Sequence, residues 1–309
     1  MKRTLLTSTA ILVTVLLISS CSSDEKGENG KGADSYTVQN DKDTTASDSL
    51  SDNAKELIDA MFRNIPSPVT LSFVLHEAGI EYRKELTHDP DLARDYASSY
   101  KQSLMLGVYG TDLTYSNITD HFPETMKFMA ASLSLYESLG INNAVSETIV
   151  SRMESNENNR DSMRVIISES FANLEGYLKD NDRMDIAGTI LAGGVVEALY
   201  ISTQVLDMNN PDPKISQLIA DQKYSIKSLV GLFQSLEKTE MTQKVYADIM
   251  QIWKIYEQME EQTNEGTDQM DGEVLRIGSK QKIVASTEQL VAIKELVSKL
   301  RMSYINTGV

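Results

Sequence analysis

From residue 53 to the C-terminus, the apolar residues of this chain recur at helical spacing, and its prolines lie between these runs and not inside them. Residues three and four positions apart share one face of an α-helix, so each run predicts an amphipathic helix with one buried face. Proline interrupts helices, and its confinement to the junctions is typical of a helical protein. The six prolines are Pro66, Pro68, Pro90, Pro123, Pro211 and Pro213. The pattern therefore predicts an all-α fold, an antiparallel bundle of long helices with an N-terminal helical cap.

Start and stop signals divide this region into helices. Asp212-Pro213 marks one helix start, Asp120 is expected to cap another, and Ser286 with Gln289 forms a capping box that opens the last helix. The expected helices cover residues 54–64, 70–86, 91–119, 121–139, 143–155, 161–179, 182–207, 212–237, 240–262 and 286–304. All of them belong to a single helical domain, residues 53–309.

Two places depart from simple helical periodicity. Gly107 and Gly110 lie inside the expected helix 91–119, which we expect to bend there. Three glycines break the pattern within residues 265–278. Around them, residues 274–277 and 282–284 have the composition to pair, so one small β-hairpin is possible near residues 272–284.

The first 20 residues have the pattern of a bacterial export signal. Lys2 and Arg3 precede the apolar residues 5–18, a stretch shorter than the roughly 20 residues that span a bilayer and suited to a signal peptide. It ends in Ile-Ser-Ser-Cys, with the chain's sole cysteine, Cys21, in last place. This sequence resembles the lipobox of bacterial lipoproteins. The resemblance implies that Cys21 receives a diacylglyceryl group on its thiol, that the signal is cut before it, and that the new amine is acylated. The alternative is an ordinary secretory signal or short anchor with a chance cysteine.

The resemblance also implies where in the cell the protein is located. Several acyl chains on one residue attach a protein stably to a membrane, whereas a single chain binds only marginally. Ser22 replaces the aspartate that retains enteric lipoproteins at the inner membrane, so we expect a lipid-anchored outer-membrane protein. Residues 22–25, Ser-Ser-Asp-Glu, are similar to the acidic tags that carry Bacteroidota lipoproteins to the cell surface, although an acidic chain can contain such a tag by chance. The periplasmic face and the cell surface both remain open.

Residues 21–52 are expected to be the lipidated cysteine and a flexible acidic linker. Residues 22–52 hold eight acids, three bases and few large apolar side chains. Such a segment does not bury enough apolar surface to offset the entropy of ordering. As a coil it would reach roughly 30 Å, by the square-root scaling of flexible linkers.

Composition and motifs exclude several function classes. The chain has 29 Lys and Arg against 45 Asp and Glu, so a nucleic-acid partner is not expected, because phosphates need clustered cations. One cysteine excludes a disulfide framework and Cys-based metal sites. The histidines, His76, His88 and His121, lack the spacing of a zinc motif, and the acid-rich residues 257–273 lack that of a calcium loop. No metal or cofactor is expected, and without a nucleophile motif an enzyme is not favoured.

Two stretches carry a second resemblance. Residues 100–139, which include Leu-Gly-Val-Tyr-Gly-Thr-Asp-Leu-Thr-Tyr at 106–115, are similar to a group of uncharacterised all-helical Bacteroidota lipoproteins. Residues 190–201, Ile-Leu-Ala-Gly-Gly-Val-Val-Glu-Ala-Leu-Tyr-Ile, are similar to the same group. The resemblance implies a helical fold and an envelope address, and it brings no assigned activity.

Two carboxylates stand in apolar helical surroundings. Glu197 lies on a stripe expected to face inward, and Asp112 lies close in sequence to apolar and tyrosine residues. A buried carboxylate must be hydrogen-bonded or neutralised, and Tyr109, Tyr115 and Tyr200 are candidate donors. These five residues form either a polar pocket for a small ligand or a satisfied polar network at a helix crossing.

Glycines accompany the second carboxylate. Gly188, Gly193 and Gly194 each cost roughly 1 kcal/mol relative to alanine in a helix interior. Their presence indicates a close helix approach or a space above them.

Together these features predict a lipid-anchored, non-enzymatic binding or scaffold module with a protein partner in the envelope. The alternative is a small-molecule-binding lipoprotein with its pocket around Asp112 and Glu197.

Overall fold

The protein is described here by a computed structural model of its 309 residues. The structure describes residues 79–145, 147–156, 159–264, 269–271, 274–276 and 280–307. The signal, Cys21, the linker, the expected helix 54–64 and the first part of the expected helix 70–86 lie outside the described residues. The N-terminal helical cap therefore stays a prediction.

The described part of the chain is all-α with a little β-structure, which confirms the predicted fold class. Its helices are α3 (Ser99–Ile118), α4 (Phe122–Ser138), α5 (Glu147–Ser155), α6 (Arg160–Asp180), α7 (Met184–Val205), α8 (Pro213–Ser235), α9 (Glu240–Tyr256) and α10 (Thr287–Ile305). Three short 3₁₀ turns are η1 (Lys84–Leu86), η2 (Pro90–Asp95) and η3 (Asn142–Ala144). The capping box of Ser286 and Gln289 opens α10 as predicted, and the Asp212 side chain caps α8.

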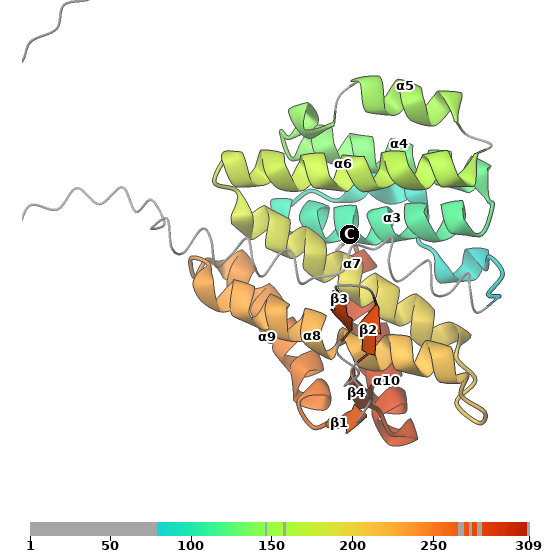
Figure 1. Cartoon of the computed structure of the whole chain (residues 1–309). Coiled ribbons are helices and arrows are strands. Elements are labelled where there is room, and N and C mark those ends of the chain that lie inside the picture. Colours follow the sequence, from blue (N-terminus) through green and yellow to red (C-terminus); the bar gives the residue numbers. More distant parts are fainter. Residues whose placement is uncertain are drawn as a thin grey trace, which may run out of the picture. The chain divides into compact units, whose positions relative to one another are not determined.

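Helix α7 is the central core helix. It contacts α3, α6, α8, α9 and α10, and Figure 1 shows it passing between the group α3–α6 and the group α8–α10. Among the described residues it is the helix long and apolar enough to cross a membrane by length and composition, and 89% of its apolar window is buried inside the body. A helix that is apolar all round suits such an enclosed position.

Helices α3 and α7 cross with their backbones in direct contact. A Cβ atom added to Gly193 would lie 2.2 Å from the Leu104 carbonyl oxygen, and one added to Gly107 would lie 2.0 Å from the Ile190 carbonyl oxygen. The Thr111 hydroxyl donates across the crossing to the Gly194 carbonyl at 3.2 Å. The predicted close helix approach is therefore confirmed, and α3 continues unbroken through its glycines.

Three expected helix starts are wrong. The helix expected from residue 143 begins at Glu147, after the separate 3₁₀ turn η3. The chain between η2 and α3 leaves the helical conformation at Tyr96, because the Ser98 side chain caps α3 and the Tyr96 hydroxyl bonds to the Ile305 carbonyl. Asp120 does not cap α4, whose N-cap position is His121. Instead Asp120 adopts a left-handed φ of 60°, which acidic and amide side chains tolerate, as the chain reverses after α3.

Two expected helix ends are also wrong. The helix predicted for 70–86 does not reach its expected end: Gly79 has φ +73° and residues 80–83 are not helical, with only η1 beyond them. The helix predicted for 240–262 stops at Tyr256. In both places a tertiary contact holds the backbone out of the helical conformation. After Gly79, the Tyr115 hydroxyl accepts a hydrogen bond from the Arg83 backbone N–H. After Tyr256, the Lys223 ammonium donates to the Met259 carbonyl at 2.7 Å.

The small β-structure lies where the sequence predicts it, but its strands pair differently. Strand β1 (Glu260–Asn264) pairs antiparallel with β4 (Lys280–Val284), and β2 (Gln269–Asp271) pairs with β3 (Val274–Arg276). The expected pairing of 274–277 with 282–284 is wrong, because β1 continues the chain after α9 and supplies the partner of β4.

Candidate functional site

Three ionisable side chains from three helices meet in the core. Asp112 comes from α3, Glu197 from α7 and Arg301 from α10, and both carboxyls have no exposed surface. The close α3–α7 crossing brings the two carboxyls within hydrogen-bonding reach of each other. The sequence therefore singled out two residues that do lie together.

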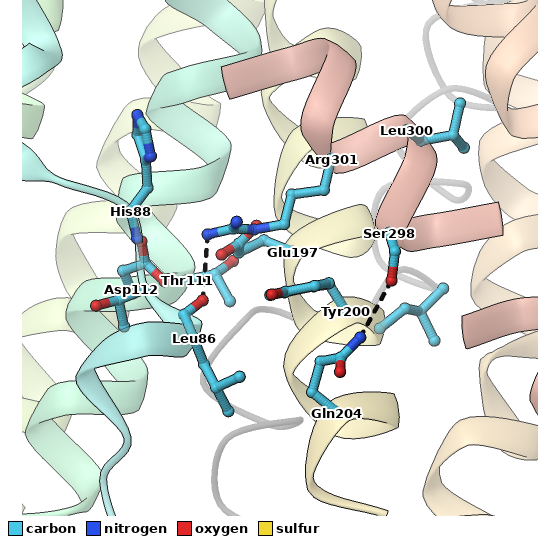
Figure 2. Close-up of polar contacts among 12 residues, drawn as sticks. Leu86, His88, Thr111, Asp112, Glu197, Tyr200, Gln204, Ser298, Leu300 and Arg301 are labelled. Carbon is cyan, nitrogen blue, oxygen red and sulfur yellow. Dashed lines mark hydrogen bonds and ion pairs between the residues drawn. The ribbon is translucent and has the colours of Figure 1, made fainter. Parts of the chain in front are cut away.

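Arg301 is the cation of this cluster. Its Nε donates to Glu197 Oε2 at 2.7 Å, and its Nη2 donates to the Leu86 carbonyl at 3.1 Å. The guanidinium carbon lies 4.2 Å from the centre of the Tyr200 ring, a cation–π contact. Figure 2 shows Arg301 reaching from α10 over Glu197 and Tyr200 to Leu86.

One proton between the carboxyls would complete the cluster. Asp112 Oδ2 accepts the His88 backbone N–H at 3.0 Å, whereas Asp112 Oδ1 and Glu197 Oε1 are buried oxygens without a donor. Burial, and next the charge of Glu197, raises the pKa of Asp112 well above its usual range. Burial also raises the pKa of Glu197, but Arg301 opposes this effect. We therefore assign the proton to Asp112, which donates to Glu197, and the negative charge to Glu197 beside Arg301.

The three tyrosines do not donate to the carboxyls, so that interpretation is wrong. Tyr109 donates to the Asp89 carbonyl at 2.8 Å, and Tyr115 donates to the Glu81 carbonyl at 3.0 Å. Tyr200 instead offers its ring face to Arg301. The carboxyls find their donors in an arginine and in a backbone N–H group.

Arg301 was missed by the sequence analysis, although its position carries a signal. The buried stripe of α10 includes Ile293, Val297, Leu300 and Tyr304. Arg301 follows Val297 by four residues and therefore lies on the same inward face. A cation at such a position needs a buried counter-ion, and Glu197 is the acid that provides it.

The buried side chains fix the backbone of a surface segment. We call residues 80–89 the strap. Its backbone accepts or donates hydrogen bonds to side chains that are at least nine-tenths buried, and these side chains are Tyr109, Asp112, Tyr115 and Arg301. Two of these bonds join the strap to the cluster itself, from Arg301 to the Leu86 carbonyl and from the His88 N–H to Asp112.

The chemistry available to the cluster is limited. An acid, a carboxylate and an arginine share one proton and one ion pair, and neither carboxyl has any exposed surface. Among the residues that the structure describes, no group of three or more His, Cys, Asp or Glu side chains could hold a metal ion. No protein-family model matches the chain, and neither a curated protein nor a solved structure matches it.

The assigned proton predicts how stability depends on pH. Because the folded pKa of Asp112 is raised, its contribution to the free energy of unfolding is fully present below the unfolded pKa of about 3.9 and is lost as pH rises toward the folded pKa. Asp112→Asn keeps a donor toward Glu197 and has no proton to lose. Urea denaturation should therefore show that the free energy of unfolding of Asp112→Asn, relative to that of the wild type, rises by about 1.4 kcal/mol per pH unit. The rise should begin near pH 5 and end where the folded pKa of Asp112 is reached.

Glu197→Gln is the matched comparison. It also replaces a carboxyl by an amide, but it removes the counter-ion of Arg301, and breaking a buried pair costs about 3–5 kcal/mol. We expect it to be less stable than the wild type at pH 8, where Asp112→Asn is at least as stable. Equal losses in both variants, independent of pH, would contradict the assignment of the proton to Asp112.

Proposed function

We propose that this protein is a lipid-anchored protein of the bacterial envelope that acts by binding a protein partner and not by catalysis. The proposed localisation rests on Cys21, the sole cysteine of the chain, which stands at the one position where a lipobox requires it. Acyl chains on this residue would hold the protein at the outer membrane, through the N-terminus alone.

The chain between Cys21 and the helical body suits a tether. Its acidic, apolar-poor composition favours a coil, and a coil of this length would let the body reach partners roughly 30 Å from the bilayer surface. Attachment and binding are then separate tasks, carried by separate parts of the chain.

The burial of the cluster argues against catalysis by its own carboxyls. Catalytic acids and bases must reach the reacting atoms, within about 3 Å or through one water. Asp112 and Glu197 have no exposed surface and have partners in Arg301 and the strap. This arrangement favours a structural role over the alternative of a ligand pocket around these two carboxyls.

The address is tested on the full chain expressed in a Gram-negative host. We expect mass spectrometry to find a mature N-terminus at a lipid-modified Cys21, and we expect the protein in the outer-membrane fraction. The Cys21→Ser chain should lack the lipid mass. An unmodified Cys21 in the mature protein, or a mature N-terminus elsewhere, would overturn the lipoprotein proposal.

Binding is tested in the same cells. Photo-crosslinking from exposed positions of the helical body should give a discrete adduct in the anchored protein, with a weaker adduct for Cys21→Ser. Protease treatment of intact cells separates the cell surface from the periplasmic face. Uniform labelling without a discrete adduct would contradict a specific protein partner.

A further inference from the structure

A surface pocket lies beside the strap. Its volume is about 310 Å³, near the lower end of the roughly 300–1,000 Å³ typical of small-molecule sites. The strap and the start of η2 form one wall, and α4 forms the other. The lining residues are Tyr82, Lys84, Thr87, His88, Asp89, Pro90, Asp91, Glu124, Lys127 and Phe128.

Buried side chains hold the wall of this pocket that the strap forms. The backbone at Leu86, His88 and Asp89 is bonded to Arg301, Asp112 and Tyr109, respectively. Burying polar side chains is unfavourable unless they are hydrogen-bonded, and here their bonds go to the segment that lines the pocket. A wall held in this way loses little conformational freedom when a ligand binds.

The pocket carries both signs of charge. Lys84 and Lys127 lie on it from opposite walls, and neither forms an ion pair with another described residue. Asp91 and Glu124 face it as well, also from opposite walls. A ligand that bears one positive and one negative group would therefore find a counter-charge for each.

His88 supplies a neutral acceptor. The Tyr96 hydroxyl donates its only proton to the Ile305 carbonyl at 2.9 Å, so the contact of 2.8 Å between Tyr96 and His88 Nε2 requires an N–H on Nε2. Burial, and next the charge of Arg301, lowers the pKa of His88 to about 4, so the ring is neutral at neutral pH. Its Nδ1 then carries a lone pair for a ligand N–H group.

We propose that this pocket binds a small zwitterion of the α-amino acid class, either a free amino acid or a short peptide. The ammonium or N–H groups of the ligand lie toward His88, Asp91 and Glu124. Its carboxylate lies toward Lys84 and Lys127, and an apolar side chain contacts Phe128 or Tyr82. The site is separate from the Asp112–Glu197 cluster, and it goes beyond the proposed protein-binding role, with no dependence on the lipid anchor.

The test is isothermal titration of the full-length protein in detergent with two probes, L-leucine and L-leucyl-L-leucine. At least one probe should bind, and the stronger of the two identifies a free amino acid or a peptide as the ligand. N-acetylation of that probe, or amidation of its carboxylate, should each weaken binding by about tenfold or more, the loss expected when a charge-assisted hydrogen bond is removed.

Pocket variants locate the binding. Lys127→Met should reduce affinity for the zwitterion but leave affinity for the amidated probe unchanged. Glu124→Gln should also reduce affinity for the zwitterion, but it should leave affinity for the acetylated probe unchanged. Lys238→Met is the matched control because Lys238 does not line the pocket, and circular dichroism confirms that each variant is folded. Failure of both probes to bind, equal binding of the blocked probes, or wild-type affinity in both pocket variants would overturn the proposal.

Discussion

Replacing Gly193 with alanine should remove most of the stability of this protein. The new Cβ would lie 2.2 Å from the Leu104 carbonyl oxygen, and the obstructing atom belongs to the backbone of α3. A side chain can rotate away from such a contact, but a helix backbone cannot. The two helices must therefore separate, and the most extensive helix contact of the body loosens along its length.

The expected size of this effect is large. Overpacking a core costs typically 1–3 kcal/mol when neighbouring side chains can adjust. Here they cannot, and we expect a loss of about 4 kcal/mol or more out of the roughly 5–15 kcal/mol that holds a typical domain folded. Gly107→Ala should have an effect of similar size, because its Cβ would lie 2.0 Å from the Ile190 carbonyl oxygen.

Gly176→Ala in α6 is the matched control. A Cβ there meets nothing within 4 Å, so the substitution should stabilise the helix by up to about 1 kcal/mol through propensity alone. Urea denaturation followed by circular dichroism measures all three variants. A Gly193→Ala protein as stable as Gly176→Ala would show that the α3–α7 crossing is wider than the structure has it.

The helices that the sequence predicted well are those with clear periodicity or a capping signal at the start. Helix α6 extends one residue beyond its expected range at each end, and α8 and α10 begin at residues whose capping side chains are visible in the sequence. Capping and periodicity involve residues within one turn of each other. They are therefore readable without knowledge of the fold.

The strap and β1 could not be predicted because their partners are distant in sequence. The backbone at Arg83 bonds to Tyr115 and that at Leu86 to Arg301, 32 and 215 residues away. Both segments have helical periodicity, and only tertiary contacts hold them in another conformation. Arg301, the third member of the buried cluster, was missed for the same reason. The apolar neighbours of Asp112 and Glu197 indicated that these two are buried, whereas a single arginine in an amphipathic helix is usually a surface residue.

Removing the charge of Arg301 should destabilise the protein nearly as much as the glycine substitutions. Arg301→Met keeps most of the aliphatic stem and leaves the Glu197 carboxylate buried without its counter-ion, next to a second carboxyl. Breaking a buried ion pair costs about 3–5 kcal/mol. The loss should be greatest at pH 8 and should shrink toward pH 5. Without Arg301, burial raises the pKa of Glu197 further and exceeds the opposing hydrogen bond from Asp112, so protonation of Glu197 stabilises the folded state as pH falls.

A double variant separates the charge from the packing. Glu197→Gln combined with Arg301→Met removes both charges and should be more stable than Arg301→Met alone at pH 8, because no unpaired ion stays in the core. Hydrogen exchange at the His88 amide gives an independent measurement, since Asp112 accepts this N–H and Arg301 holds the strap at Leu86 two residues away. Exchange at His88 should accelerate in Arg301→Met at pH 8. If the double variant were as unstable as the single one and His88 exchange were unchanged, the guanidinium would act only by filling space. The strap would then be held by Tyr109, Asp112 and Tyr115 without it.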